Sequence, residues 1–130
     1  MTRIAQLIAA IFVLVLGSAA LVSLFSPMTV AGPSGFNPVD NYGLTNIRTL
    51  GAPTLVLAGI TAFGIWKENW RLILPASAYF FTNGSARVIS TMVEGYEPVM
   101  QRGLMITFTL FALSLVSIYL FRRGEEANAQ

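Results

Sequence analysis

The sequence has 130 residues, of which 55% are hydrophobic and only 11% are charged, and it carries a net charge of +2. Soluble domains have charged side chains at about a quarter of their positions, so this composition indicates an integral membrane protein with a single domain. The eight Lys and Arg residues are scattered, most of them at the ends of apolar stretches, and form no basic stripe, which argues against nucleic-acid binding.

The sequence contains neither cysteine nor histidine. Thiol chemistry, a Ser-His-Asp triad, haem ligation by histidine and a zinc site of the usual Cys/His type are therefore excluded. Acid–base catalysis would depend on Glu94, Glu97 or a tyrosine, and no catalytic motif surrounds them. We expect a protein without catalytic residues, cofactor or metal.

The first apolar stretch covers residues 4–25 and follows Arg3. A cleaved signal peptide is the competing interpretation, because a basic start and an apolar core precede small residues at positions 17–20. However, the apolar run continues to Phe25 and supplies the ~20 residues that a membrane span needs, whereas a signal core is shorter. We therefore expect a retained transmembrane helix.

The next segment, residues 26–45, has three prolines together with Gly32 and Gly35, which is typical of a loop. The second predicted span, residues 46–66, has Arg48 in its first turn. Only residues 67–71 separate it from the third span, so the two spans must be antiparallel neighbours. Trp66 and Trp70 flank this turn, as expected of side chains at a membrane–water interface.

The third predicted span, residues 71–93, has a polar line along one side. Asn83, Arg87, Ser90 and Glu94 follow one another at spacings of four, three and four, so they share one face of a helix with ~3.6 residues per turn. An arginine within an apolar span is costly and normally faces protein or water. This face is therefore expected to point away from lipid.

The fourth predicted span, residues 103–121, is almost purely apolar and is followed by a short polar tail, residues 122–130, which we expect to be frayed. Together the spans predict an all-α integral membrane protein, a four-helix bundle with up-down-up-down topology.

Orientation follows from the excess of basic residues in cytoplasmic loops. Five of them fall on one side of the predicted membrane: Arg3, Lys67, Arg71, Arg122 and Arg123. Both termini are therefore expected to be cytoplasmic, in an inner (cytoplasmic) membrane, with residues 26–45 and 94–102 outside. Arg48 and Arg87 then lie in the outer half, and Arg87 is ~9 Å below the outer edge at 1.5 Å per residue.

This topology predicts a polar cluster at the outer end of the bundle, made of Asn46, Arg48, Asn83, Arg87, Ser90 and Glu94. One interpretation is structural, with ion pairs such as Arg87–Glu94 holding helices in register. A second is a ligand site, because one carboxylate does not neutralise two guanidinium groups and an external anion would. A third is a docking surface for another membrane protein.

Part of this pattern resembles a known family. The residues that carry the resemblance are Asn46, Arg48 and Gly51 in the second span, and Gly84, Ala86, Arg87, Glu94, Gly95 and Pro98 around the third. They resemble a family of small bacterial four-helix membrane proteins catalogued as a domain of unknown function, in the neighbourhood of DoxX-like proteins. The resemblance covers roughly residues 40–120, and Glu94 stands where Asp is common. It implies the fold and no activity, and thiol redox chemistry does not transfer to a chain without cysteine.

These observations predict a non-enzymatic accessory or structural subunit of a larger membrane complex, in contact with membrane lipids and with a partner protein or further copies of itself. The alternative is an extracytoplasmic-facing binding or transport protein for a small anion or lipid headgroup. Small residues along the outside of the bundle would favour the subunit, and a cavity lined by both Arg48 and Arg87 would favour the ligand site.

Overall fold

A computed structural model describes residues 2–32, 37–38 and 40–128, and its regular structure is entirely helical. The elements are α1 (Thr2–Phe25), α2 (Pro27–Ala31), α3 (Asn41–Trp66), the 3-10 helix η1 (Trp70–Leu72), α4 (Leu74–Glu94) and α5 (Pro98–Asn128). The predicted all-α class is confirmed.

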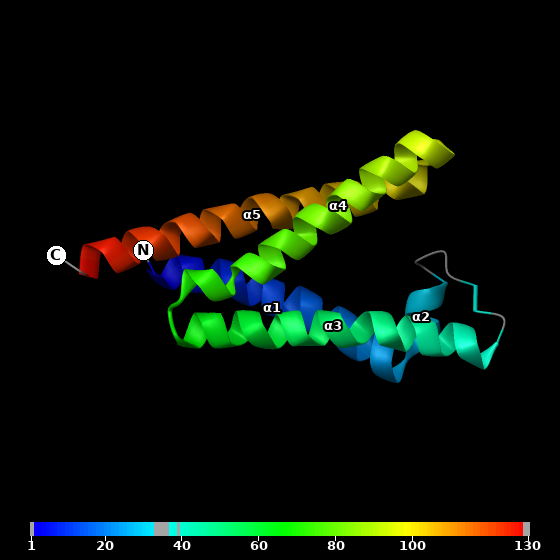
Figure 1. The fold of residues 1–130 in the computed structure, drawn as a ribbon, viewed down its shortest axis with the longest axis horizontal. Helices are drawn as coiled ribbons and strands as arrows, with labels where there is room; N and C mark the ends of the chain where they lie inside the picture. The colour runs from blue at the N-terminus through cyan, green and yellow to red at the C-terminus, as the bar shows by residue number, and fades with distance from the viewer. Residues whose placement is uncertain (1, 33–36, 39, 129–130) are drawn as a thin grey trace.

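The long helices form two pairs (Figure 1). α1 packs along α3, and α4 packs along α5, while α1 also contacts α5 and thereby joins the pairs. The pairs converge where α3 turns into η1 and diverge toward the end where α4 leads into α5. α3 and α4 make little contact, so the two pairs form an open arrangement, and the up-down-up-down bundle expected from the sequence stays a prediction.

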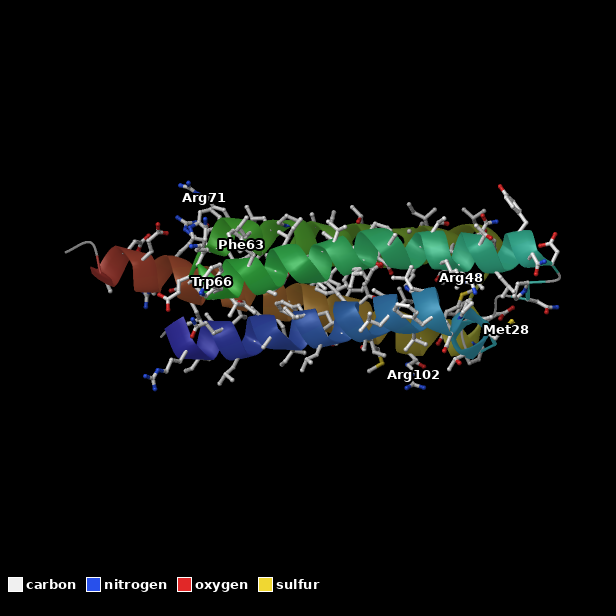
Figure 2. All side chains as sticks on the ribbon, turned by 90° about the horizontal axis from the view of Figure 1, so that it is seen from below. Met28, Arg48, Phe63, Trp66, Arg71 and Arg102 are labelled. Carbon is white, nitrogen blue, oxygen red and sulfur yellow. The ribbon has the colours of Figure 1, made fainter. Side chains whose placement is uncertain are left out.

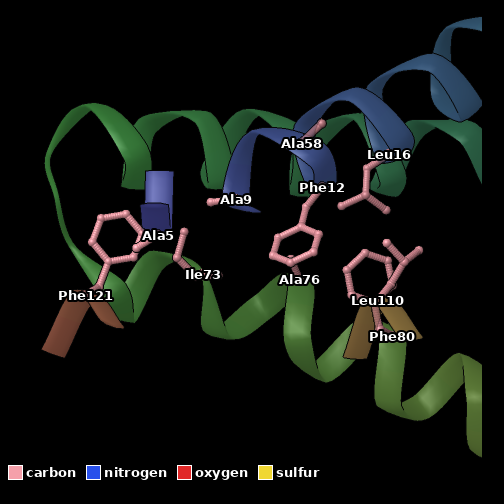
Figure 3. Close-up of a cluster of buried hydrophobic side chains, with 10 residues drawn as sticks. All are labelled: Ala5, Ala9, Phe12, Leu16, Ala58, Ile73, Ala76, Phe80, Leu110 and Phe121. Carbon is pink, nitrogen blue, oxygen red and sulfur yellow. The ribbon is translucent and has the colours of Figure 1, made fainter. Parts of the chain in front are cut away.

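The core lies where α1 meets the other pair (Figure 3). Ala5, Ala9 and Phe12 on α1 are fully buried, and they pack with Ile73, Ala76, Phe80, Leu110 and Phe121. The rings of Phe12 and Phe80 meet edge to face with centroids 5.6 Å apart. Because α1 supplies the centre of the core, its removal would expose most of these side chains.

Two buried hydroxyl groups connect helices within this core. Ser117 on α5 donates a hydrogen bond to the carbonyl oxygen of Ala5 on α1, at 3.0 Å. Ser114 on α5 donates to the hydroxyl of Ser77 on α4, at 2.8 Å. Since buried polar groups without partners are destabilising, such bonds favour this particular register of the helices.

Proline, glycine and a capping aspartate set the helix boundaries. Pro27 occupies the first turn of α2, and Pro98 is the first residue of α5, a position where the missing N–H is not needed. Asp40 caps α3 by accepting a hydrogen bond from the Gly43 amide at 2.7 Å. α4 ends at Glu94 and is followed by Gly95, whose φ of 96° is a conformation that glycine adopts readily.

These signals place helices outside the expected segments. The loop expected over residues 26–45 contains α2 and the first turn of α3, which begins at Asn41 because Asp40 caps it there. α5 begins at Pro98 and continues to Asn128, so the described part of the expected tail is helical rather than frayed.

Within the described chain, three helices are long and apolar enough to cross a membrane: residues Arg3–Phe25, Asn41–Trp66 and Met100–Ala127, in α1, α3 and α5. The helix expected to form the third of four spans, α4, is not among them. Its 21 residues include Asn83, Arg87 and several hydroxyl side chains, which reduce its overall apolar character.

Candidate functional site

The predicted polar face of α4 is present, and its members interact in neighbouring pairs. The Nε of Arg87 donates a hydrogen bond to Oδ1 of Asn83, one turn earlier, at 3.1 Å. The hydroxyl of Ser90 donates to the carboxylate of Glu94, one turn later. No hydrogen bond among the described residues joins Arg87 to Glu94, so the geometry does not contain the ion pair considered above.

Arg87 lies against α5 at a glycine. A Cβ atom placed on Gly103 would lie 2.5 Å from Nη1 and 3.1 Å from Cζ of Arg87. The absence of a side chain at position 103 therefore makes room for the guanidinium group. Asn83 on one side and Gly103 on the other hold this group at the α4–α5 interface.

Arg87 also lines a cavity of about 150 Å³ that is open to the surface. All four long helices contribute to it: Val15, Leu16 and Ala19 from α1, Thr54 from α3, Tyr79, Phe80, Asn83 and Arg87 from α4, and Thr107 and Leu110 from α5. Its wall is mostly apolar, and Arg87 is the one charged residue among the described residues that line it.

Arg48 belongs to a different place. It lies on α3, is exposed, and its Nε donates to the carbonyl oxygen of Leu24 at 3.2 Å. Leu24 is in the last turn of α1, where carbonyl groups have no partner within the helix, so Arg48 satisfies one of them. Asn46, also exposed, lies one turn before Leu50, and its carbonyl oxygen accepts a hydrogen bond from the Thr49 hydroxyl.

The six candidate residues thus fall into two groups. Asn83, Arg87, Ser90 and Glu94 lie on α4, and Asn46 and Arg48 lie on α3, next to the end of α1. Only Asn83 and Arg87 line the cavity. Asp40, the residue before α3 begins, accepts a hydrogen bond from the Gly43 amide and caps the helix. The role of these residues in ligand binding stays a prediction.

Three residues beside Arg87 were not among the candidates. Thr54 and Thr107 line the cavity, and Gly103 makes room for the guanidinium group. Both threonine hydroxyls donate to a carbonyl one turn earlier in their own helix, at 3.0 Å for Thr54 and 2.7 Å for Thr107. Their positions could not be inferred from periodicity, because they depend on how the pairs of helices cross.

The hydroxyl side chains of α4 are largely satisfied by their own helix. Thr82, Ser85 and Thr91 each donate to a carbonyl oxygen four residues earlier, at 2.8–2.9 Å. In the described part of the chain, no buried side-chain nitrogen or oxygen lacks a hydrogen-bond partner. Arg87 is exposed, and only its Nε bonds to another described residue, so its terminal nitrogens can bond to groups outside the chain.

Aromatic and basic side chains gather at the opposite end (Figure 2). The amino group of Lys67 lies 4.3 Å from the ring centroid of Trp66, and the guanidinium of Arg122 lies 5.3 Å from that of Trp70. Trp70 also donates to the Glu125 carboxylate at 3.1 Å. Figure 2 shows Trp66 and Arg71 near one end and Arg48 and Arg102 near the other.

The described residues include no group of three or more acidic side chains placed to hold a metal ion. Comparison of the chain with protein-family models, with curated proteins and with solved structures gives no match.

Proposed function

We propose that this chain is an integral membrane protein whose four long helices cross the bilayer in up-down-up-down order and that it serves as a non-catalytic subunit of a larger membrane assembly. The observation that carries the membrane location is the apolar exterior of α1, α3 and α5. In their most apolar segments, only 22–28% of the residues are buried within the molecule.

The exposed side chains are large and hydrophobic. Leu7 and Leu14 on α1 are 70% and 71% exposed, and Met105 on α5 is 64% exposed. Leaving such surface in water costs about 25 cal/mol per Å², and large apolar patches on a soluble monomer are rare. Lipid acyl chains remove this cost along the full length of the helices.

In this proposal α4 also crosses the membrane, as the third of four spans in chain order, although it is less apolar than α1, α3 and α5. It packs along α5, and the hydroxyl groups of Thr82, Ser85 and Thr91 are bonded to its own carbonyl oxygens. Asn83 is half-buried, and both Asn83 and the exposed Arg87 line the cavity. A helix of this kind is stable in a bilayer when a neighbouring helix covers its polar face.

The subunit role is supported by small residues on the outside of α3. Ala52, Gly59 and Ala62 are exposed and share one face of the helix, and a Cβ on Gly59 would have no atom within 4 Å. In membranes, small residues of this kind allow a second helix to approach closely. We propose that this face of α3 contacts a helix of the partner protein.

Two measurements test the two parts of this proposal. Alkaline carbonate extraction of membranes should leave the protein in the pellet, and release into the supernatant would refute the membrane location. Native mass spectrometry after purification in mild detergent should show a complex with another membrane protein. A wild-type chain recovered only as a free monomer would refute the subunit role.

A pair of matched variants examines the contact face. Ala62→Leu should release the partner, because the added side chain separates the helices. Ala112→Leu makes the same change at an exposed alanine on α5 and should leave the complex intact. Equal effects of the two substitutions would show that α3 is not the contact.

The alternative function, binding of a small anion or lipid headgroup, is favoured by one observation, the cavity beside Arg87. Arg48 does not line it, so the site would use one arginine rather than the two expected from the sequence.

A further inference from the structure

We propose that the cavity beside Arg87 binds an anionic phospholipid, with the lipid phosphate at the terminal nitrogens of Arg87 and the first methylene groups of an acyl chain against Leu16, Phe80 and Leu110. This inference rests on the proposed membrane location and is independent of the proposed partner protein.

The charge of Arg87 is the first argument. Its Nε bonds to the neutral side-chain oxygen of Asn83, and the carboxylate of Glu94 is bonded to Ser90. Its terminal nitrogens make no hydrogen bond to another residue of the described chain, so four of the five guanidinium N–H groups are available. A cation without a counter-charge is costly near the membrane, and a phosphate offers both the charge and acceptors for bidentate hydrogen bonds.

The fixed position of the guanidinium is the second argument. Asn83 orients its Nε, and Gly103 accommodates its outer edge, where a Cβ atom would come within 2.5 Å of Nη1. A group that is already held in place loses less conformational entropy when it binds a ligand. Arg87 is exposed, so an anion can reach its terminal nitrogens, and the bond to Asn83 restricts the orientation of the guanidinium.

The shape and lining of the cavity are the third argument, and they distinguish a lipid from free phosphate. Beyond Arg87 the wall is formed largely by apolar side chains, among them Leu16, Phe80 and Leu110. A cavity of about 150 Å³ has room for a few carbon atoms and not for a whole lipid. Because the cavity is open, the remainder of the acyl chains would lie outside it, along the exposed apolar surface of the helices.

Lipid binding can be measured by native mass spectrometry of the purified full chain, titrated with phosphatidylglycerol or with phosphatidylcholine. The wild-type protein should retain phosphatidylglycerol with a preference of about tenfold or more. Arg87→Gln should reduce this preference to nearly one. Arg102→Gln, which removes an exposed charge near the same end and does not line the cavity, should leave it unchanged.

Gly103→Ala provides the sharper test, because it preserves every charge. Its added Cβ meets the flexible end of Arg87, so the helix accommodates the change by moving the guanidinium away. The preference for phosphatidylglycerol should fall several-fold while the protein stays folded. Equal affinity for both lipids in the wild-type protein, or an equal loss in the Arg102→Gln variant, would overturn the proposal.

Competition with excess inorganic phosphate distinguishes a site for a phospholipid from a site for free phosphate. Phosphatidylglycerol that remains bound in its presence supports the lipid, because the acyl chain adds contacts that phosphate lacks. Complete displacement would show that the site takes a free anion and would overturn the lipid. A negative result in these lipid measurements would not alter the result of carbonate extraction, so the membrane location is tested independently of lipid binding.

Discussion

Gly51 and Gly59 lie on the same helix in opposite surroundings. A Cβ on Gly51 would meet Cβ of Ser23 at 2.9 Å and the backbone oxygen of Ala20 at 3.1 Å, whereas one on Gly59 would meet nothing within 4 Å. Gly51→Ala should therefore lower the free energy of unfolding by about 1–3 kcal/mol, because α1 must move. Gly59→Ala should leave it unchanged or raise it by up to ~1 kcal/mol.

Thermal unfolding of both variants in the same detergent measures this difference. A Gly51 variant as stable as the wild-type protein would show that α1 and α3 do not approach closely at Gly51.

Arg87 and Glu94 share a face of α4 and bond to different partners, Asn83 and Ser90. Their substitutions should therefore act independently. In a double-mutant cycle, Arg87→Leu and Glu94→Leu are expected to be additive within about 0.5 kcal/mol. Unfolding of the two single variants and the double variant tests this expectation. A double variant more stable than either single one would instead indicate a direct ion pair between the two side chains.

At the scale of the helices, the end of α3 contains a strained residue. Glu68 has a φ of 52°, and the amides of Glu68 and Asn69 bond back to the carbonyls of Ile65 and Gly64 at 3.2 and 2.9 Å. Helices commonly end in this way with glycine at the left-handed position. The Glu68 carboxylate also accepts a hydrogen bond from Gln6 at 3.1 Å.

Two substitutions separate the backbone conformation from this hydrogen bond. Glu68→Gly and Glu68→Ala both remove the bond to Gln6, but only glycine relieves the left-handed conformation. The glycine variant should therefore be more stable to unfolding than the alanine variant by about 1 kcal/mol. Equal stabilities would mean that residue 68 does not adopt a positive φ in solution.

Two features of the helices could be predicted from the sequence alone. The common face of Asn83, Arg87, Ser90 and Glu94 followed from the helical repeat, since that spacing needs no knowledge of other helices. The start of α3 at Asn41, five residues before the predicted span, could also have been predicted, because Asp40 is a typical capping residue. Both are local properties of the chain.

Contacts between helices could not be predicted from the helical repeat or from capping residues. The position of Arg87 against Gly103 and the bond from Arg48 to the Leu24 carbonyl depend on how two helices cross. Periodicity identifies the face of a helix and not the partner that covers it. For this reason the sequence grouped both arginines in one cluster, whereas the structure assigns each to a different helix interface.

For the whole molecule, the main test concerns orientation. Both the beginning of α1 and the end of α5 lie near the turn between α3 and η1, where Lys67, Arg71 and Arg122 are found. The excess of basic residues predicts that this end is cytoplasmic. A reporter fused after Gln130 should be active in its cytoplasmic form. A periplasmic signal at that position would invert the molecule and place Arg87 toward the cytoplasm.

The pairing of α4 with α5 has a consequence for how the protein would be synthesised. α4 alone is not apolar enough to qualify as a span, whereas α5, which follows after residues 95–97, is. Two antiparallel helices that hide one polar face between them enter a bilayer more favourably together than singly. Insertion of α4 would therefore wait until the ribosome has produced α5, and the second half of the chain would enter the membrane as a hairpin.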